Sequence, residues 1–299
     1  MGIPVRKESP TVEDDLVWVE CDDGSRTLKN LRLNESYHSG CGAISESLCV
    51  YLANSGIASM LAPPQPPNVA PARLVEYGFG TGTNFILTAA LAEYFGSPLS
   101  YCGLENRLLP NELIGTLEIS DSIAAASTGA SAALDAALRL LSDSCGSIDL
   151  CNYLDHLRVV ERRLREVWFQ LQAKPEFGAS EASQEAVAHR IHFSNQVELA
   201  LWVGDATKFD ASSYSELFSE RKMSCDAVYF DAFAPEVSPE LWTQDVFRNA
   251  FSLLSASGKL TSYCVKGAIR RELKSVGFQP RCVPGPPGGK REVLVASPA

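Results

Sequence analysis

The chain has 299 residues, of which 45% are hydrophobic, so it is long enough to bury a full core. Its formal net charge of −10 repels a phosphate backbone on average, which argues against tight nonspecific binding of nucleic acid. The sequence has neither an apolar run of the roughly 20 residues that a membrane span needs nor the apolar region of a signal peptide, so we expect a cytosolic protein.

Residues 1–70 predict a small β-rich cap followed by a linker. The turn Asp22-Asp23-Gly24-Ser25 lies between the apolar runs 16–19 and 27–28, which is typical of a β-hairpin. A helix is expected to begin near Gly42, because apolar side chains follow at helical spacing. The proline-rich run at residues 63–67 then predicts a stiff, extended linker.

Residues 71–299 predict one α/β domain. Apolar segments at residues 74–77, 99–104, 198–203, 225–230 and 259–264 alternate with helical stretches, which is typical of a doubly wound, mostly parallel, Rossmann-like sheet. The last strand, at residues 292–296, is expected to pair beside residues 281–283 as an antiparallel C-terminal strand. Residues 118–192 are first rich in alanine and serine and then amphipathic, so we interpret them as a helical insertion.

The cysteine and histidine patterns do not indicate a metal site. The nine cysteines are scattered and form neither a disulfide framework nor a CxxC zinc pattern, so we interpret most of them as buried thiols. His189 and His192 are close in the sequence but lack a partnering cysteine or carboxylate pattern. We therefore expect no metal.

Three glycines, Gly78, Gly80 and Gly82, lie between a predicted strand and a predicted helix. Glycine permits a tight turn there and lets a ligand approach the N-terminus of the helix. Glu105 ends the next predicted strand, where a carboxylate can accept hydrogen bonds from both hydroxyls of a ribose. Sites for NAD share this arrangement, so the glycines alone leave the cofactor open.

Acidic residues end four of the predicted strands, namely Glu76, Glu105, Asp205 and Asp231. Ligands of open α/β sheets lie at the carboxyl ends of the strands, and the Asp205-Ala206 pair is placed to bind the adenine amino group. A row of carboxylates suits S-adenosylmethionine, which is cationic at sulfur and has no phosphate. A dinucleotide would be repelled through its pyrophosphate, so we predict S-adenosylmethionine as the cofactor.

Five motifs carry a resemblance to a known family. They are Tyr37-His38-Ser39-Gly40-Cys41-Gly42-Ala43, Gly78-Phe79-Gly80-Thr81-Gly82-Thr83-Asn84-Phe85, Phe230-Asp231-Ala232-Phe233-Ala234-Pro235 with Pro239-Glu240-Leu241-Trp242-Thr243, Lys266-Gly267-Ala268-Ile269-Arg270-Arg271, and the stretch from Pro284 to Glu292. With these motifs in order, the sequence resembles the MnmC/MnmD-type tRNA methyltransferases.

The resemblance implies a class I methyltransferase that methylates the amine of 5-aminomethyl-2-thiouridine at the tRNA wobble position, giving 5-methylaminomethyl-2-thiouridine. In bifunctional relatives a flavin oxidase domain follows and exposes that amine. This sequence ends at Ala299, so it resembles the stand-alone methyltransferase, for which a separate flavin-dependent enzyme is a candidate partner.

The chemistry of that reaction assigns roles to two residues. Displacement at the sulfonium methyl needs a neutral amine nitrogen that is well oriented, whereas an alkylamine is largely protonated near neutral pH. We therefore assign Asp231 as the carboxylate that orients the nitrogen and receives its proton. Phe233 is either a ring that packs against the uracil or an aromatic residue of the core.

Other roles come from the resemblance. It implies that Tyr37, His38 and Ser39 close the methionine end of the cofactor and that Asn84 belongs to the cofactor motif; for His38 a purely structural role stays open. The basic residues Lys266, Arg270, Arg271, Lys290 and Arg291 are candidates for contacts with tRNA phosphates, which position a substrate without reading its sequence.

Two other functions remain open at this point. A small-molecule transferase, which would methylate or aminopropylate a polyamine-like amine on the same fold, agrees with the acidic net charge, whereas the basic C-terminal residues favour tRNA. A noncatalytic cofactor-binding protein would require that Asp231 be only a structural turn residue.

Overall fold

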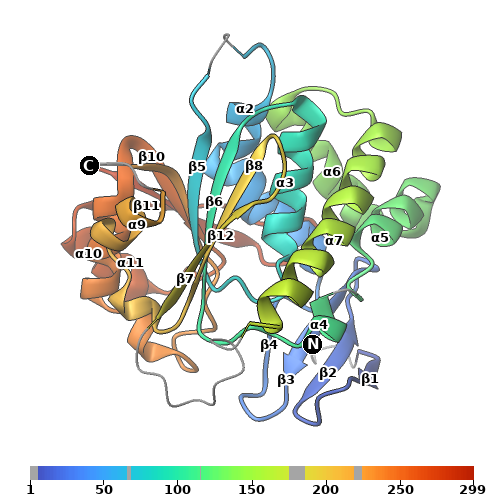
Figure 1. The fold of residues 1–299 in the computed structure, drawn as a ribbon, viewed down its shortest axis with the longest axis horizontal. Helices are drawn as coiled ribbons and strands as arrows, with labels where there is room; N and C mark the ends of the chain where they lie inside the picture. Colours follow the sequence, from blue (N-terminus) through green and yellow to red (C-terminus); the bar gives the residue numbers. More distant parts are fainter. Residues whose placement is uncertain (1–5, 66–68, 115, 175–185, 219–223) are drawn as a thin grey trace.

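The computed structural model describes residues 6–65, 69–114, 116–174, 186–218 and 224–299, which form two sheets and the helices around them (Figure 1). The smaller sheet has the order β1-β2-β3-β4, and the larger has the order β11-β12-β10-β9-β5-β6-β8-β7. The strands of the smaller sheet are β1 (Glu8–Pro10), β2 (Leu16–Glu20), β3 (Arg26–Asn30) and β4 (Glu35–Ser36).

The centre of the larger sheet is parallel, which confirms the predicted α/β Rossmann-like fold. Its parallel strands are β5 (Ala72–Tyr77), β6 (Leu99–Glu105), β8 (Val197–Val203), β9 (Cys225–Phe230) and β10 (Leu254–Ser262). The antiparallel ones are β7 (Val187–His192), β11 (Phe278–Pro284) and β12 (Glu292–Pro298), and β12 pairs with β11 as predicted. Strand β5 lies between β6 and β9, where the strand order reverses and where such sheets bind ligands.

Side chains of a strand alternate between the two faces of a sheet, and in this sheet apolar side chains lie on both faces, so helices cover both. In β5, Leu74 points to a core shared with α3 (Thr83–Phe95), α6 (Ala132–Cys145) and α7 (Leu150–Gln172), on the right in Figure 1. Its neighbours Val75 and Tyr77 point to the opposite core, with α9 (Ala211–Phe218), α10 (Gln244–Leu253) and α11 (Gly267–Ser275). The sheet is thus buried on both faces.

The predicted hairpin and the predicted helix of the N-terminal segment are both confirmed. Strands β2 and β3 pair on either side of the Asp-Gly turn, and α1 (Ala43–Glu46), the π-helix η1 (Ser47–Ala53) and α2 (Ile57–Leu61) follow. The buried carboxylate of Asp23 accepts hydrogen bonds from the backbone amides of Ser25 and Ser45, both at 3.0 Å. The hairpin turn therefore holds the start of α1.

The boundary at residue 70 stays a prediction. Residues 66–68 of the proline-rich linker lie outside the described residues. Leu48 and Tyr51 of η1 pack in the same core as α3 and α7, so this part of the N-terminal segment contributes to the core of the larger sheet.

The predicted insertion at residues 118–192 is helical over most of its described length, in α5 (Ile119–Ala125), η2 (Ala126–Ala130), α6 and α7. The prediction was wrong at its end, where residues 187–192 form strand β7 at the edge of the sheet. Val187, His189 and Ile191 are half-buried, and the residues between them are exposed, which is the period of a strand. Residues 175–185 lie outside the described part of the chain.

The remaining short elements are α4 (Asn111–Ile114), η3 (Ala206–Lys208) and η4 (Pro239–Leu241). All nine cysteines are free thiols and six of them are buried, as predicted. Within the described ranges, no group of three or more histidine, cysteine, aspartate or glutamate side chains is arranged to hold a metal ion. Among the described helices, none has the length and apolar character needed to cross a bilayer.

Candidate active site

The glycine turn after β5 and the turn after β9 are packed against each other. A Cβ atom on Gly78, whose φ is +88°, would lie 2.6 Å from the carbonyl oxygen of Asp231. A Cβ atom on Gly80, whose φ is +51°, would lie 3.0 Å from Cδ1 of Tyr37. Because L side chains rarely adopt positive φ and the space is filled, only glycine fits these two positions.

The insertion helix α7 supports the same turn from the side. The ring of Trp168 stacks on Phe79 with their centroids 5.5 Å apart, and the indole Nε1 donates to the carbonyl oxygen of Leu109 at 2.8 Å. A Cβ atom on Gly82 would lie 3.0 Å from Cδ2 of Leu164. The structure therefore gives the insertion a positioning contact with the glycine turn.

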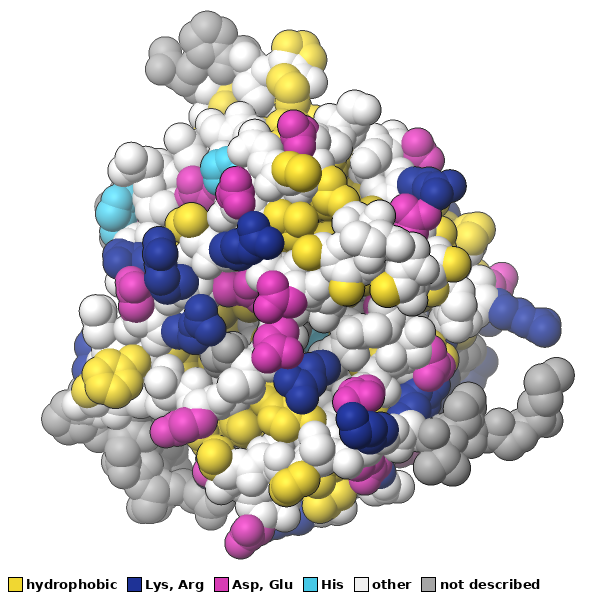
Figure 2. Space-filling view, turned by 90° about the vertical axis from the view of Figure 1, so that its right-hand side faces the viewer, with side chains coloured by type: hydrophobic (Ala, Val, Ile, Leu, Met, Phe, Trp, Pro, Cys, Tyr) yellow, Lys and Arg dark blue, Asp and Glu magenta, His cyan; other side chains and the backbone are white. Residues whose placement is uncertain are grey.

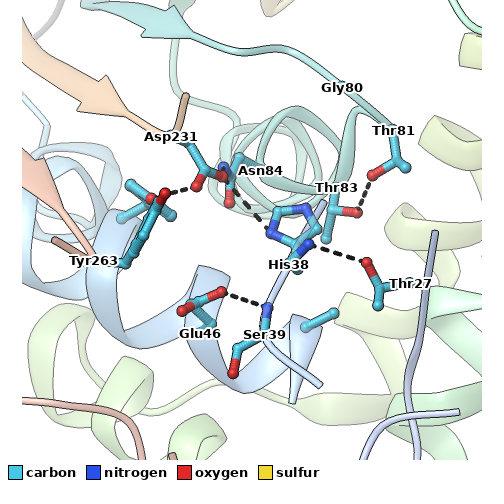
Figure 3. A network of polar contacts seen from close by, with 12 residues as sticks. Thr27, His38, Ser39, Glu46, Gly80, Thr81, Thr83, Asn84, Asp231 and Tyr263 are labelled. Carbon is cyan, nitrogen blue, oxygen red and sulfur yellow. Dashed lines mark hydrogen bonds and ion pairs between the residues drawn. The ribbon is translucent and has the colours of Figure 1, made fainter. Parts of the chain in front are cut away.

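Asp231 lies at the end of β9 in a buried network of hydrogen bonds (Figure 3). Its Oδ1 accepts from the hydroxyl of Tyr51 at 2.5 Å, and its Oδ2 accepts from Nδ2 of Asn84 at 2.8 Å. The same Nδ2 donates to Oε1 of Glu76 at 2.7 Å, and the hydroxyl of Tyr101 donates to Oε2 of Glu76 at 2.6 Å. The network joins residues of β5, β6, α3 and η1 to Asp231, which directly follows β9.

Burial dominates the electrostatics of Asp231. The side chain is 4% exposed, and desolvation raises its pKa well above the usual range of an aspartate. The negative charge of Glu46 raises this pKa further, whereas the hydrogen bonds from Tyr51 and Asn84 lower it. A carboxylate with a raised pKa is a stronger base, which is useful where the proton of an amine must be accepted.

His38 is a buried, neutral neighbour of Asp231. Its Nδ1 lies 3.6 Å from Oδ2 of Asp231 and has no hydrogen-bond partner among the described residues. Its backbone amide donates to Oγ1 of Thr27 at 3.1 Å, which fixes the segment on β3 (Figure 3). Because burial lowers the pKa of His38 to about 4, the imidazole is uncharged at neutral pH.

A cleft of about 300 Å³ opens over Asp231. It is bounded by residues 34–40 on one side and by Phe233 and Tyr263 on the other, and Glu46 and Lys290 also line it. The rings of Tyr37 and Phe233 meet edge to face with their centroids 5.1 Å apart. The cleft thus combines aromatic rings with carboxylates, which suits a planar ligand that carries a cationic group.

The turn after β9 is fixed by two hydrogen bonds to its main chain. Nε1 of Trp242 donates to the carbonyl oxygen of Phe233 at 2.8 Å, and the hydroxyl of Tyr263 donates to the carbonyl oxygen of Ala232 at 2.9 Å. These contacts keep Phe233 at the wall of the cleft.

Two predicted cofactor residues, Glu105 and Asp205, lie at the carboxyl ends of β6 and β8. Oε2 of Glu105 accepts from the backbone amide of Gly80 at 2.7 Å, and Oε1 accepts from the amide of Arg107 at 3.2 Å. Asp205 is exposed and accepts from the amide of Thr207 at 2.9 Å, so it begins η3, where Ala206 follows it. Both carboxylates therefore lie at strand ends, as predicted.

The donors and acceptors at the turn fit S-adenosylmethionine. Oδ1 of Asn84 is a buried acceptor without a hydrogen-bond partner in the described structure, so an ammonium ligand such as the amino group of the cofactor could satisfy it. Ser39, by contrast, donates its amide to Oε2 of Glu46 at 2.9 Å, and both oxygens of Glu76 are bonded within the network. The roles assigned to these residues stay predictions.

The structure separates the predicted basic residues into two groups. Lys266, Arg270, Arg271 and Arg291 are exposed on the C-terminal part of the chain, where Lys266 pairs with Glu236. Lys290, whose side chain is 42% exposed, also lines the cleft, with its Nζ 3.9 Å from the ring centroid of Tyr263 and 4.0 Å from Oε1 of Glu46.

Four residues of the site carry no functional signal in the sequence, namely Tyr51, Tyr101, Glu46 and Tyr263. Tyr51 and Tyr101 follow the apolar pattern of a helix and a strand, and their hydroxyls gave no separate signal. Glu46 precedes η1 and was not distinguishable from a solvated helix carboxylate, although it is 2% exposed.

The chain is similar to known methyltransferases over much of its length. A family model described as S-adenosyl-L-methionine-dependent methyltransferase matches residues 177–299, which include Asp231 and the C-terminal basic residues. The tRNA 5-methylaminomethyl-2-thiouridine biosynthesis bifunctional protein MnmC of Burkholderia multivorans is 28% identical over 280 residues, which cover 92% of this chain and 33% of that protein. The protein of the same description from Ralstonia nicotianae is 34% identical over 110 residues, which cover 36% of this chain and 15% of that protein. The chain thus spans about a third or less of the length of these relatives.

Among solved structures, MnmC2 from Aquifex aeolicus superposes with a TM-score of 0.62 over 94% of this chain and 69% of that chain, at 22% identity. This likeness shows the fold. The matched family model and the relatives support an S-adenosyl-L-methionine-dependent methyltransferase domain that is similar to part of the MnmC proteins.

Proposed function

We propose that this domain methylates the amine of 5-aminomethyl-(2-thio)uridine at the tRNA wobble position, giving 5-methylaminomethyl-(2-thio)uridine. The observation that carries the proposal is the buried carboxylate of Asp231 at the floor of a cleft whose wall includes the rings of Tyr37 and Phe233. The descriptions of the MnmC relatives support the substrate. We expect a flavin-dependent oxidase activity to supply the aminomethyl intermediate.

In this proposal the glycine turn, Glu105 and Asn84 hold the cofactor, and Asp205 with Ala206 bind its adenine. When bound, S-adenosylmethionine supplies an electrophilic methyl group. Asp231 accepts a proton from the substrate ammonium and orients the neutral nitrogen that results. Because His38 is uncharged beside it, the imidazole does not compete with the substrate cation for the carboxylate.

Contacts with tRNA phosphates are assigned to the exposed C-terminal residues Lys266, Arg270, Arg271 and Arg291. The face that carries the insertion helices is a weaker candidate, because its Lys and Arg side chains are interspersed with Asp and Glu (Figure 2). On α6 and α7, for example, Arg139 pairs with Asp135 and Arg158 pairs with Asp155.

One observation favours a second candidate, a transferase for a small polyamine-like amine. Glu35 and Glu46 line the cleft together with Asp231, and three carboxylates would also bind a ligand with several ammonium groups. The two proposals differ in the acceptor and share the cofactor and the role of Asp231.

The test is methyl transfer from labelled S-adenosylmethionine to tRNA that carries the aminomethyl intermediate, with the product nucleoside identified by mass spectrometry. Loss of a general base lowers turnover by about 10² to 10⁴, so Asp231→Asn should lose kcat by that factor while calorimetry shows nearly unchanged affinity for the cofactor. Asp245→Asn, the same change at a side chain that is 88% exposed, is the control and should behave as wild type. If polyamines accept the methyl group and this tRNA does not, the second candidate replaces the first.

A further inference from the structure

The ammonium of Lys290 makes two defined contacts in the cleft. Its Nζ lies over the ring of Tyr263 at 3.9 Å from the centroid and 4.0 Å from Oε1 of Glu46. A cation over an aromatic face and beside a carboxylate is held by both contacts. Binding of a tRNA phosphate, the role that the sequence predicts for this residue, would require the ammonium to leave the Tyr263 ring and the Glu46 carboxylate.

The turn between β11 and β12 aims Lys290 at the cleft. The amide of Gly285 donates to the carbonyl oxygen of Arg291 at 2.9 Å, and the amide of Gly289 donates to that of Pro286 at 3.0 Å. A Cβ atom on Gly285 would lie 2.0 Å from the carbonyl oxygen of Lys290, so the chain passes itself too closely there for any residue but glycine. The tight turn therefore fixes the backbone of Lys290, and the side chain, which is 42% exposed, reaches Tyr263 and Glu46 from it.

Two buried carboxylates share this cleft. Glu46 is 2% exposed and its Oε2 accepts from the amide of Ser39 at 2.9 Å, while the side chain of Asp231 is 4% exposed. Like charges in a desolvated site oppose each other's ionisation, so a cation is needed if both are to be charged.

The groups around Asp231 identify that cation. Tyr51 faces it from η1, Asn84 from α3 and His38 from the segment after β4, and these three are neutral. The buried carboxylate of Glu76 on β5 shares Nδ2 of Asn84 with Asp231 and adds no positive charge. Glu46 faces the same cleft from α1. Among the described residues that line the cleft, Lys290 is the one with a fixed positive charge.

We propose that Lys290 is a positioning residue whose ammonium, seated between the Tyr263 ring and the Glu46 carboxylate, keeps Asp231 ionised and ready to receive the proton of the substrate amine. This inference rests on the proposed function of Asp231. The positive charge of Lys290 lowers the pKa of Glu46 and the pKa of Asp231, in the direction that the inference requires.

The first test compares kcat and KM across pH for Lys290→Met and Lys290→Arg, with the exposed Lys274→Met as the control and Arg291→Met as a probe of phosphate contact. Removal of the charge should move the acid limb of kcat to higher pH, with a loss of about tenfold near pH 6, a smaller loss near pH 9 and little change in KM for tRNA. Lys290→Arg should keep most of the activity. A rise in KM alone, as expected for Arg291→Met, would overturn the inference.

The second test needs no substrate and uses thermal unfolding. Burial raises the folded-state pKa of Glu46 and of Asp231, so the stability that they contribute is complete below their unfolded pKa and is lost as pH rises through the folded pKa. Without Lys290 this loss is larger, so the Tm difference between wild type and Lys290→Met should grow as pH rises, whereas Lys274→Met should show no such growth.

The outcomes separate this inference from the proposed function. A Tm difference that is constant with pH would assign Lys290 to packing alone and overturn the inference. If the difference grows with pH but the wild type transfers no methyl group to tRNA, the ionising role of Lys290 is supported and the proposed substrate is wrong.

Discussion

The hydroxyl of Tyr51 should control the ionisation of Asp231, and Tyr51→Phe removes it with little change in volume. The hydroxyl donates to Oδ1 at 2.5 Å, and burial raises the pKa of Tyr51 well above its usual range, so the phenol remains a donor. A hydrogen bond to a charged group contributes about 1.5–3 kcal/mol, which corresponds to about 10- to 150-fold in kcat where ionised Asp231 limits the rate. The remaining donor, Nδ2 of Asn84, is shared with Glu76.

The assay is kcat for methyl transfer to aminomethyl tRNA at saturating cofactor, measured between about pH 6 and pH 9. Because the lost bond stabilises the charged form, the pKa of Asp231 rises in Tyr51→Phe, and the acid limb of the profile moves to higher pH. The loss should be largest at low pH and should shrink as pH rises.

Tyr77→Phe is the matched control. Tyr77 is buried on β5, its ring stacks on Phe230 with centroids 4.9 Å apart, and its hydroxyl has no hydrogen-bond partner in the described structure. It loses the same atom and should keep both kcat and its pH profile. The reasoning is refuted if Tyr51→Phe lowers kcat by the same factor at every pH, or if Tyr77→Phe lowers it equally.

Two further predictions concern the cofactor turn and acid stability. Gly80→Ala should weaken binding of S-adenosylmethionine by at least about tenfold in calorimetry, because the new Cβ meets Tyr37, whereas Gly96→Ala has similar φ and open space and should leave affinity unchanged. His38, whose pKa falls from the ordinary 6.5 to about 4, gives stability that is present above pH 6.5 and lost as pH falls through about 4. In urea unfolding, the wild type should lose about 3 kcal/mol more of its free energy of unfolding than His38→Gln as the pH falls from about 7 to below 4. An unchanged pH dependence of unfolding in the variant would contradict the burial of a neutral imidazole.

The sheet could be predicted because its signal is local. Central strands such as β9 are short apolar runs, and the glycine turn marks the point where a strand meets a helix. Strand β7 was not recognised because it lies at an edge, is half-buried on one side and contains His189 and His192 instead of a continuous apolar face. Its pairing with β8 is a tertiary contact that its own residues indicate only weakly.

The acidic strand ends could be predicted for a related reason. Parallel strands end at one edge of the sheet, so Glu105 and Asp231 had to lie near the glycine turn. Tyr51 could not be found in this way, because it lies 180 residues from Asp231 in the sequence and on a helix. The helical pattern predicts that the ring of Tyr51 is buried, but it does not indicate which group its hydroxyl contacts.

For the basic C-terminal residues, the number of positive charges in the sequence does not predict which side chains can bind phosphate. Summed along the sequence, Arg270, Arg271, Lys290 and Arg291 are equivalent, but each charge acts according to the groups that face it. Lys290 faces the buried carboxylate of Glu46. If its ammonium moved away to bind a phosphate, the Glu46 carboxylate would stay desolvated without a nearby positive charge, which is unfavourable. Arg270 and Arg271 are exposed on α11 and are not placed beside a buried carboxylate. The free energy that they gain by binding a phosphate is therefore not reduced by exposing a desolvated anion. We therefore expect two roles within this basic segment, phosphate contact for Arg270 and Arg271 and a place in the cleft for Lys290, which follows the tight turn at Gly285.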